Sequence, residues 1–458
     1  MDKTEILQQI QQQKEYLPVS AFKDCKERVN SLKLLYKNIN LLKPEIFAAL
    51  KADLNKSEEE SYMAEIGIVL SEISYMIKHC KRFARPKRVR TALSQCPGKA
   101  YRIPTAYGSV LIISPWNYPF MLSLDPLVDA IAAGNCVVLK PSQTSPHVSD
   151  VLEKLIRMTF TPEQVVVAKG GREECDFLLE QDWDYIFFTG STRVGKTIME
   201  KAAKKFIPVT LEMGGKSPCI VDETANIPLA AKRIVFGKFL NCGQTCVAPD
   251  YIYCAKSVKD QLIKEISRQI VLQYSVDPIS NESYPKLINK KQYDWIVKLL
   301  SESKVVFGGR HSEDKLKIEP TIAECSFDDL AMQEEIFGPL LPVVTFDSVD
   351  EVIDKMHQLP KPLAFYVFSA NRENQNKLIS SCDFGGGCVN DTILHLATSH
   401  MGFGGLKQSG LGAYHGKIGF DTFSHYKSVL KKSQHFDIPV RYQPYGKIKY
   451  FFMKLFLK

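Results

Sequence analysis

The sequence predicts an α/β fold built on a doubly wound parallel sheet. Between residues 109 and 213, short and almost wholly apolar runs alternate with stretches whose apolar residues recur at helical spacing. A strand that is apolar on both faces has to be covered on both faces, as a parallel sheet is by its helices. Glycine or polar residues follow the runs, and ligands of such sheets bind beyond the carboxyl ends of the strands. We therefore expect a Rossmann-like, nucleotide-binding domain.

The predicted elements follow one another in a regular order. Residues 1 to about 90 show helical periodicity with few strand signals, and after Pro97 and Gly98 the pattern changes to strand–helix pairs. The predicted strands cover 109–113, 136–139, 165–167 and 185–188, and the helices that follow them cover 122–133, 146–158, 172–180 and 193–205. A second α/β stretch begins with a predicted strand over 217–221 and continues to about residue 420.

The chain lacks internal repeats and low-complexity linkers, so we expect its lobes to pack closely. We divide it into five regions. They are an N-terminal helical region packed on the cofactor domain (1–95), an oligomerisation arm (96–108 with 421–440), a dinucleotide-binding domain (109–213), a catalytic domain (214–420) and a basic aromatic tail (441–458).

The composition is that of a folded protein, with 45% hydrophobic and 24% charged residues in a chain of 458. The twelve cysteines are spread from Cys25 to Cys388 without regular spacing, which favours reduced thiols over a disulfide framework. No window reaches the roughly 18 apolar residues of a membrane span, and no signal peptide opens the chain. The sequence therefore predicts a soluble, cytoplasmic protein.

Two further classes of site are not supported by the sequence. The net charge is +8, but the basic segment 78–90 lacks interleaved aromatic residues and any recognised module, so it is interpreted as a solvated helix end rather than a nucleic-acid site. Cys242 and Cys246 lack the further cysteines or histidines of a zinc site. We expect neither a nucleic-acid partner nor a metal.

A cysteine that follows a glycine-containing turn is the candidate nucleophile. Residues 239–248 read FLNCGQTCVA, and Cys246 lies just after the turn. A thiolate is a strong nucleophile, and a turn leaves it accessible and flanks it with free N–H groups that can stabilise an oxyanion. The residues alone also fit the alternative that Cys246 is a buried packing residue.

A carboxylate and an amide complete the candidate catalytic set. Glu212 follows the β-type run 208–211 and precedes two glycines, which suits a general base that activates water; the alternative is a solvated loop carboxylate. Asn117 lies between Trp116 and Tyr118 in a segment bounded by prolines, so its rigid amide can donate to an oxyanion. An asparagine that only forms a turn is the other interpretation.

The stretch 190–197 reads GSTRVGKT and satisfies the pattern of a phosphate-binding P-loop. An apolar run precedes it and a helical pattern follows it, which is the context of a nucleotide triphosphatase. This hypothesis requires Lys196 to hold phosphate and gives Cys246 no role. It competes with the interpretation below.

Six segments in order carry a family resemblance: SPWNYP, FTGSTRVGK, LEMGGKSP, FLNCGQTCVAP, QEEIFGP at 333–339 and FGGLKQSGLG at 403–412. They resemble the motif series of the aldehyde dehydrogenase superfamily and extend from about residue 20 to residue 432. The closing stretch 414–430, YHGKIGFDTFSHYKSVL, together with the absence of an N-terminal extension, is similar to the class 3 branch, which includes fatty, aromatic and medium-chain aldehyde dehydrogenases.

The resemblance implies a reaction and the roles of its residues. Cys246 would attack an aldehyde to give a thiohemiacetal, Asn117 and the Cys246 N–H would hold the oxyanion, and hydride would pass to a nicotinamide. Glu212 would activate the water that hydrolyses the resulting thioester. The implied cofactor-binding residues are Trp116, Lys140, Gln143, Gly190, Ser191, Gly195, Leu211, Gly214, Glu335 and Phe337. In this interpretation the P-loop pattern is incidental, because 190–195 is the family's loop for the pyrophosphate of NAD.

One residue departs from the family pattern and bears on the cofactor. Where the family commonly has KPSE, this chain has KPSQ, with Gln143 in place of the carboxylate that repels a 2′-phosphate. Lys140 lies nearby in the same motif. We therefore expect NADP to be accepted as well as NAD.

Substrate, partners and location follow in the same way. An apolar lining around Tyr118 and residues 391–403 predicts a medium-chain or long-chain aliphatic or an aromatic aldehyde; transfer of the acyl group to coenzyme A rather than water is the alternative reaction. Class 3 resemblance implies a homodimer through an arm that includes 99–107 and 423–432. The tail segment 447–458, KIKYFFMKLFLK, combines lysines and aromatic residues. Docking of its apolar residues on the body or on a partner subunit is the favoured interpretation, and peripheral contact with an anionic membrane surface is the alternative.

Overall fold

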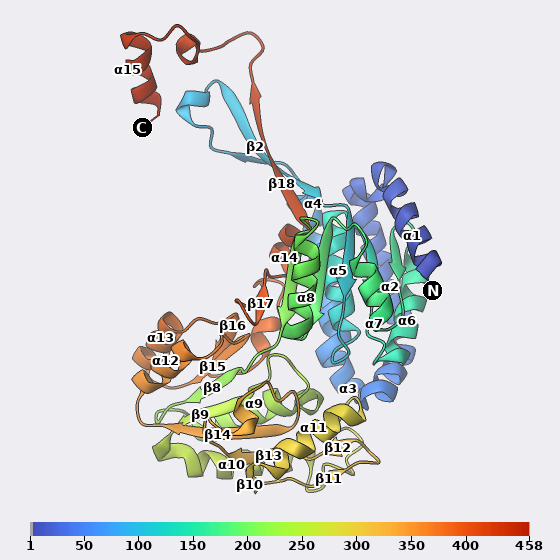
Figure 1. Ribbon diagram of the computed structural model, residues 1–458, viewed down its shortest axis with the longest axis vertical. Coiled ribbons are helices and arrows are strands. Elements are labelled where there is room, and N and C mark those ends of the chain that lie inside the picture. Colours follow the sequence, from blue (N-terminus) through green and yellow to red (C-terminus); the bar gives the residue numbers. More distant parts are fainter. Residues whose placement is uncertain (1–2, 458) are drawn as a thin grey trace.

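Apolar strands and the helices that cover them form two sheets in the body, and a third, smaller sheet projects from it (Figure 1). The computed structural model describes residues 3–457; Met1, Asp2 and Lys458 lie outside the described residues. The first sheet has six strands in the order β17-β7-β6-β3-β4-β5, all parallel except β17. Its strands are β3 (Ser109–Ile113), β4 (Cys136–Lys140), β5 (Val165–Val167), β6 (Tyr185–Gly190), β7 (Val209–Met213) and β17 (Gly410–Leu411).

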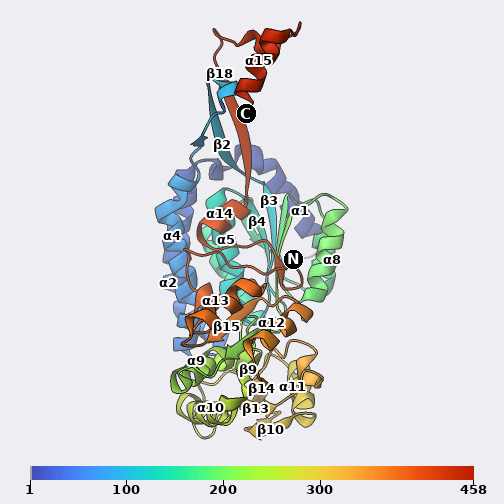
Figure 2. The same cartoon turned by 90° about the vertical axis from the view of Figure 1, so that its left-hand side faces the viewer.

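Alternate residues of these strands face two separate cores, which confirms the doubly wound arrangement. In β3, Val110 and Ile112 belong to one apolar cluster, while Leu111 and Ile113 belong to the other. The first cluster is covered by α2, α4, α5 and α6, and the second by α1, α7 and α8, as Figure 2 shows for α2, α4 and α8. The helices are α1 (Lys3–Tyr16), α2 (Cys25–Leu54), α3 (Glu58–Ser61), α4 (Gly67–Phe83), α5 (Met121–Ala133), α6 (Pro146–Thr159), α7 (Arg172–Leu179) and α8 (Thr192–Ala203).

The second sheet has seven strands in the order β10-β13-β14-β9-β8-β15-β16, of which only β10 pairs antiparallel with its neighbour. Its strands are β8 (Pro218–Val221), β9 (Tyr251–Ala255), β10 (Lys304–Phe307), β13 (Thr321–Glu324), β14 (Leu340–Phe346), β15 (Ala364–Phe368) and β16 (Gly386–Val389). Its helices are α9 (Ile227–Phe239), α10 (Lys259–Tyr274), α11 (Lys290–Ser301), α12 (Val349–Gln358) and α13 (Arg372–Ser381). A small ribbon of β11 (His311–Ser312) and β12 (Lys317–Ile318) lies beside it.

The arm is a three-stranded antiparallel sheet in the order β1-β2-β18, formed by β1 (Lys87–Val89), β2 (Gly98–Ala106) and β18 (Ser424–Lys432). The register of β2 and β18 runs from Ser424 opposite Ala106 to Lys432 opposite Gly98. Residues 87–89 were expected to be helical and are instead a strand here, because their backbone pairs with Ala100–Arg102. Helix α14 (Gly416–Thr422) precedes β18, and helix α15 (Lys447–Phe456) lies at the end of the described chain.

Candidate active site

Two cavities meet at Cys246, between the two sheets of the body. Both are lined by Leu122, Cys246, Phe403 and Tyr414. The apolar cavity holds about 760 Å³ of empty space, and its other lining residues are Met63, Ala64, Ile68, Tyr118, Met121, Phe236, Leu240, Thr245, Val247, Ile393, Leu394, Leu396, Ala397 and His415. The mixed cavity holds about 910 Å³, and its other lining residues are Pro115, Trp116, Asn117, Thr189, Gly190, Ser191, Glu212, Met213, Gly214, Gln292, Trp295, Glu335, Ile336, Phe337 and Leu363.

A left-handed turn places Cys246 at this junction. Helix α9 ends at Phe239, and Asn241, Cys242 and Gly243 then take φ values of 52°, 54° and 75°. Three consecutive residues in the left-handed region reverse the chain sharply, and a Cβ at Gly243 would collide with the Gly338 carbonyl, so only glycine fits there. The turn therefore positions Cys246 between the two cavities.

Burial and nearby carboxyls control the Cys246 thiol. Burial raises the pKa of Cys246 to about 12, and the proximity of Glu335 and Glu212 adds to the rise. The backbone N–H groups of Cys246 and Val247 act in the opposite direction. Cys242 is no rival as a nucleophile, since it lines neither cavity and its Sγ donates to Tyr284 Oη at 3.3 Å.

Glu212 lies in β7 and lines the mixed cavity. Its backbone pairs with Gly410 of β17, which fixes the position of its side chain along the strand. Within residues 3–457, neither carboxyl oxygen of Glu212 has a hydrogen-bond partner. Burial raises the pKa of Glu212 well above its ordinary value, so the group can hold a proton in a neutral site and exchange it with water.

Asn117 is held from both ends by buried polar groups. Its Nδ2 donates to the Gln244 carbonyl at 3.0 Å, which leaves one N–H of the amide for another acceptor. Its backbone carbonyl accepts from Lys56 Nζ at 3.0 Å and from Asn241 Nδ2 at 2.7 Å. These bonds tie the segment that carries Asn117 to the segment that leads to Cys246.

The Lys56 ammonium is itself anchored by a fully buried ion pair. Lys56 Nζ lies 2.6 Å from Glu65 Oε1, and neither side chain is exposed. The other Glu65 oxygen accepts from the backbone N–H groups of Phe120 and Met121 at 2.9 and 3.2 Å. Sequence reasoning missed both residues, because in a helical pattern a lone Lys and Glu are usually solvent-exposed.

The residues expected on the nicotinamide side, Gly214, Glu335 and Phe337, line the mixed cavity. Trp116, which was expected on the adenosine side with Lys140, lines the mixed cavity as well. Trp116 and Phe337 form an edge-to-face pair with ring centroids 5.5 Å apart. A Cβ at Gly214 would collide with the Glu335 carboxyl, so glycine permits close approach at this point. Glu335 is half-buried, and desolvation together with the nearby Asp250 raises its pKa to about 8. One of its oxygens has no hydrogen-bond partner in the part of the chain that the structure describes.

Lys140 and Gln143, which were expected on the adenosine side, lie in a third cavity at the carboxyl end of β4. It is lined by Lys140 and Gln143 together with Arg172 and Arg193. Lys140 Nζ donates to the carbonyls of Pro141 and Gly170 at 3.0 and 2.6 Å, so the amine is engaged by the backbone.

Two expected cofactor residues do not line these cavities. Gly195 packs inside α8, where a Cβ would collide with Met213 Sδ, and Leu211 is a buried residue of the second core cluster. Both act through packing, since they set how closely α8 and β7 approach the cleft.

The start of helix α8 does not fit the phosphate-binding P-loop that the sequence pattern suggested. Strand β6 ends at Gly190 and α8 begins at Thr192, so a single residue, Ser191, separates them. Lys196 is therefore well inside the helix, exposed, and outside the cavities described above. A P-loop needs a wider loop whose backbone surrounds a phosphate, and the geometry does not provide it. The N-terminal N–H groups of α8 and the glycines beside the cleft fit a dinucleotide instead.

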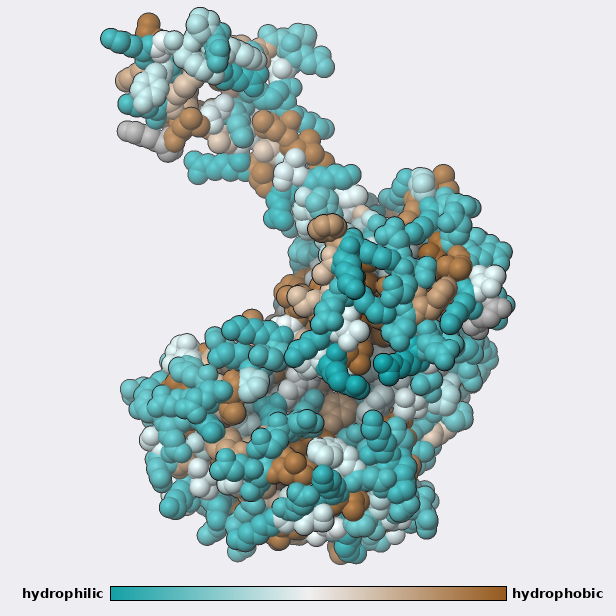
Figure 3. Space-filling view, viewed as in Figure 1, coloured by the Kyte–Doolittle hydropathy of each residue, from teal (hydrophilic) through white to brown (hydrophobic). Residues whose placement is uncertain are grey.

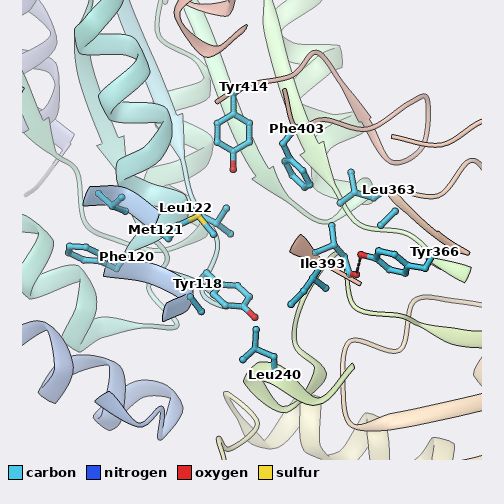
Figure 4. Close-up of a cluster of buried hydrophobic side chains, with 14 of the residues drawn as sticks. Tyr118, Phe120, Met121, Leu122, Leu240, Leu363, Tyr366, Ile393, Phe403 and Tyr414 are labelled. Atoms are coloured by element: carbon cyan, nitrogen blue, oxygen red, sulfur yellow. Dashed lines mark hydrogen bonds between the residues drawn. The ribbon is translucent and has the colours of Figure 1, made fainter. Parts of the chain in front are cut away.

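Tyr118 and Ile393, Leu394, Leu396, Ala397 and Phe403 of the segment 391–403 line the apolar cavity, where an apolar lining was expected. Figure 4 shows Tyr118, Leu122, Phe403 and Tyr414 converging from different elements on the same space. The Tyr118 hydroxyl is satisfied by Thr245 Oγ1 at 2.6 Å, and Lys56 Nζ lies over the Tyr118 ring, 4.0 Å from its centroid. Met63, Ala64 and Ile68 of the helical hairpin were not foreseen, because their helical spacing also fits ordinary core packing.

Comparison with known proteins identifies the family. The aldehyde dehydrogenase family profile matches residues 1–429. The chain is 45% identical over 457 residues to 4,4'-diaponeurosporen-aldehyde dehydrogenase of Staphylococcus aureus, with 99% of each chain covered. It is 42% identical over 428 residues to aldehyde dehydrogenase family 3 member H1 of Arabidopsis thaliana, covering 92% of this chain and 88% of that one.

Two more comparisons agree. The identity with the dimeric NADP-preferring aldehyde dehydrogenase of Mus musculus is 42% over 407 residues, covering 89% and 90% of the two chains. A solved structure, the substrate-bound state of S. aureus AldH, matches with a TM-score of 0.97 and 45% identity over 99% of both chains. The chain therefore belongs to the aldehyde dehydrogenase family, among its family 3 members, and is an enzyme that oxidises aldehydes.

Proposed function

We propose that this enzyme oxidises medium-chain or long-chain aliphatic or aromatic aldehydes to carboxylic acids with NAD or NADP, through a covalent intermediate on Cys246. The observation that carries the proposal is the meeting of an apolar cavity with a polar one at Cys246. An aldehyde in the first cavity and a nicotinamide in the second would both contact the same sulfur. That shared position supplies the proximity on which the reaction depends.

The first step is addition of the Cys246 thiolate to the aldehyde carbonyl. The free N–H of the Asn117 amide and the Cys246 backbone N–H stabilise the oxyanion of the thiohemiacetal. When bound, the nicotinamide cofactor supplies the hydride acceptor and a positive charge near the thiol. The thiohemiacetal carbon loses its hydride and becomes a thioester carbon.

The second step is hydrolysis. Glu212 takes a proton from water, which attacks the thioester carbonyl; the same N–H donors hold the second oxyanion, and the carboxylic acid leaves Cys246 as a thiolate. A buried carboxyl with a raised pKa suits a base that has to accept a proton. The alternative of transfer to coenzyme A gives such a base no task. Release of free acid without coenzyme A supports hydrolysis, and a strict coenzyme A requirement would overturn it.

The residues around Gln143 support acceptance of both cofactors. Gln143 adds no negative charge to the adenosine-side cavity. Arg172 and Arg193 line the same cavity, as does the Asp176 carboxylate, whose Oδ2 lies 3.7 Å from Arg172 Nε. Because Lys140 is engaged by backbone carbonyls, the arginines rather than Lys140 would attract a 2′-phosphate. The mouse relative is named as NADP-preferring. Similar kcat/KM values for NAD and NADP are expected; a hundredfold preference for NAD would contradict this.

The volume and apolar lining of the cavity beside Cys246 support the substrate class, as does the S. aureus relative, which is named for diaponeurosporen-aldehyde. We expect kcat/KM to rise from hexanal to decanal and to be measurable with benzaldehyde. An enzyme that prefers acetaldehyde would contradict an extended apolar site.

The arm and the name of the mouse relative support a homodimer. Strands β2 and β18 stand clear of the body in Figure 3, and most of their residues are exposed or half-buried. Paired with a second copy, such an arm would bury its exposed residues. Light scattering on the purified full chain should give twice the chain mass; a monomer at micromolar concentration would refute the proposal.

The C-terminal tail supports the proposal that this cytoplasmic enzyme contacts a membrane surface peripherally. Helix α15 places Ile448, Phe451, Phe452 and Leu455 on one face, with exposures of 75, 63, 38 and 53%. None of the helices formed by residues 3–457 could cross a membrane. Vesicles of phosphatidylglycerol should bind the full chain more strongly than phosphatidylcholine vesicles. A chain that stops at Gly446 should lose this binding, and equal binding by both chains would remove membrane contact from the account.

A further inference from the structure

Two thiols lie in contact at the open end of a helical hairpin. Helices α2 and α4 run back from the short segments around Met63, and the first residue of α2, Cys25, meets Cys80 in the last turn of α4. Their Sγ atoms are 3.2 Å apart, although the two residues are separated by 55 positions in the chain. No other pair of cysteine sulfurs in the described residues is recorded at such a distance.

The surroundings give the two thiols different roles. Cys25 is partly exposed, whereas Cys80 is buried and its Sγ also donates to the Ala132 carbonyl at 3.4 Å. The Arg28 guanidinium lies one turn after Cys25 and donates from Nη1 to the same Ala132 carbonyl at 3.2 Å. Burial raises the pKa of the Cys80 thiol to about 12, and the positive charge of Arg28 offsets only part of that rise. A reagent from solvent would therefore reach Cys25 first, with Cys80 placed behind it.

We propose that Cys25 and Cys80 form a redox modification site that a hydroperoxide converts into an intramolecular disulfide. The Cys25 thiolate attacks one peroxide oxygen, the O–O bond breaks, and the other oxygen leaves as an alcohol or as water. Cys80 then attacks the sulfur of the Cys25 sulfenic acid, and water leaves. Two thiols and one hydroperoxide thus give one disulfide, one alcohol and one water, with two electrons passing from sulfur to oxygen.

The geometry requires little movement for this bond to form. The sulfurs have to approach from 3.2 Å to about 2.05 Å, and they lie at the ends of two packed helices. Closing the loop between residues 25 and 80 reduces the freedom of the unfolded chain, so the disulfide should stabilise the fold. The proposal does not depend on the proposed catalytic mechanism.

The cross-link lies far from the substrate cavity. Met63 and Ala64, which line the cavity, are at the opposite end of the hairpin from Cys25. Helix α2 has 30 residues and is therefore about 45 Å long. Oxidation of this pair should leave kcat and KM unchanged, whereas oxidation of Cys246 should abolish turnover. The two events are therefore separable by measurement.

The experiment treats the full chain with hydrogen peroxide and maps the tryptic peptides without reduction. The expected result is a Cys25–Cys80 cross-linked peptide, reversed by dithiothreitol, with a Tm higher by about 3–6 °C. The Cys25→Ser variant should lack both the peptide and the shift. The matched control is Cys175→Ser, another partly exposed cysteine, which should retain both.

Two results would overturn the proposal. One is the absence of a Cys25–Cys80 peptide after peroxide has oxidised the partly exposed Cys25 to a sulfenic, sulfinic or sulfonic acid. The other is a peroxide-induced Tm rise that persists in Cys25→Ser. Because Cys25 is partly exposed, its serine variant should fold even if Cys80→Ser does not, and the proposal stays falsifiable with that variant alone.

Discussion

Replacement of Lys56 by Met tests whether a buried ion pair positions Asn117. The change removes the ammonium that contacts Glu65 at 2.6 Å and the Asn117 carbonyl at 3.0 Å, in a place where neither charged side chain is exposed. The volume is nearly conserved, so the loss is electrostatic rather than a cavity.

The expected loss of stability follows from the Glu65 carboxylate, which stays buried after Lys56 is replaced. Removing one partner of a buried pair typically costs about 3–5 kcal/mol, because the other charge stays buried and unpaired. Glu65 retains two backbone N–H donors, from Phe120 and Met121, which places the expected cost near the lower limit, about 3 kcal/mol. The Asn117 carbonyl keeps only its bond from Asn241, and a shift of the oxyanion donor should lower kcat by roughly 10- to 100-fold.

Urea denaturation and steady-state kinetics measure the two effects. The double variant Lys56→Met with Glu65→Gln should lose less free energy of unfolding than the sum of the single variants, because neither charge is left buried without its partner. The control is Lys154→Met, which breaks a surface pair with Glu45 in which both side chains are about half exposed, and which should cost less than about 1 kcal/mol. Additive losses in the double variant, or a Lys56→Met cost as small as that of the control, would refute the reasoning.

Further predictions concern buried titratable groups and one glycine. Burial lowers the pKa of Lys238 from 10.5 to about 8, so between these pH values the unfolded chain binds more protons than the folded chain and the free energy of unfolding should rise with pH. The Lys238→Met variant should lose this slope in urea midpoints and gain on the order of 3 kcal/mol in free energy of unfolding at pH 7. Because the raised pKa values of Cys246 and Glu212 favour their protonated forms, kcat/KM should increase from pH 6 to pH 9, and a flat profile would contradict it. A Cβ in Gly214→Ala would collide with the Glu335 carboxyl, so KM for the cofactor should rise at least tenfold, with wild-type Tm as the check on folding.

The strands that carry the site were predictable because each leaves a local signal. Strand β3 is an example: its five residues are all buried, and such apolar runs are visible in the sequence itself. The ordered motifs identified Asn117, Glu212 and Cys246 as parts of one site, and all three line the mixed cavity.

What supports the site was not predictable, because it depends on contacts between distant positions. Lys56 meets a carbonyl 61 residues later in the chain, and nothing near Lys56 in the sequence indicates burial. Strand β1 was missed for a related reason, since Lys87–Val89 is exposed and basic and becomes a strand only through pairing with β2. The left-handed turn before Cys246 likewise depends on the close approach of Gly338 to Gly243.

The most direct test of the covalent mechanism is mass spectrometry of the Glu212→Gln variant mixed with decanal and NAD in the absence of coenzyme A. The account predicts one acyl group per chain, attached to the peptide that contains Cys246, with NADH formed in a single burst and little further turnover. No adduct, an adduct on another cysteine, or undiminished acid production by this variant would contradict it.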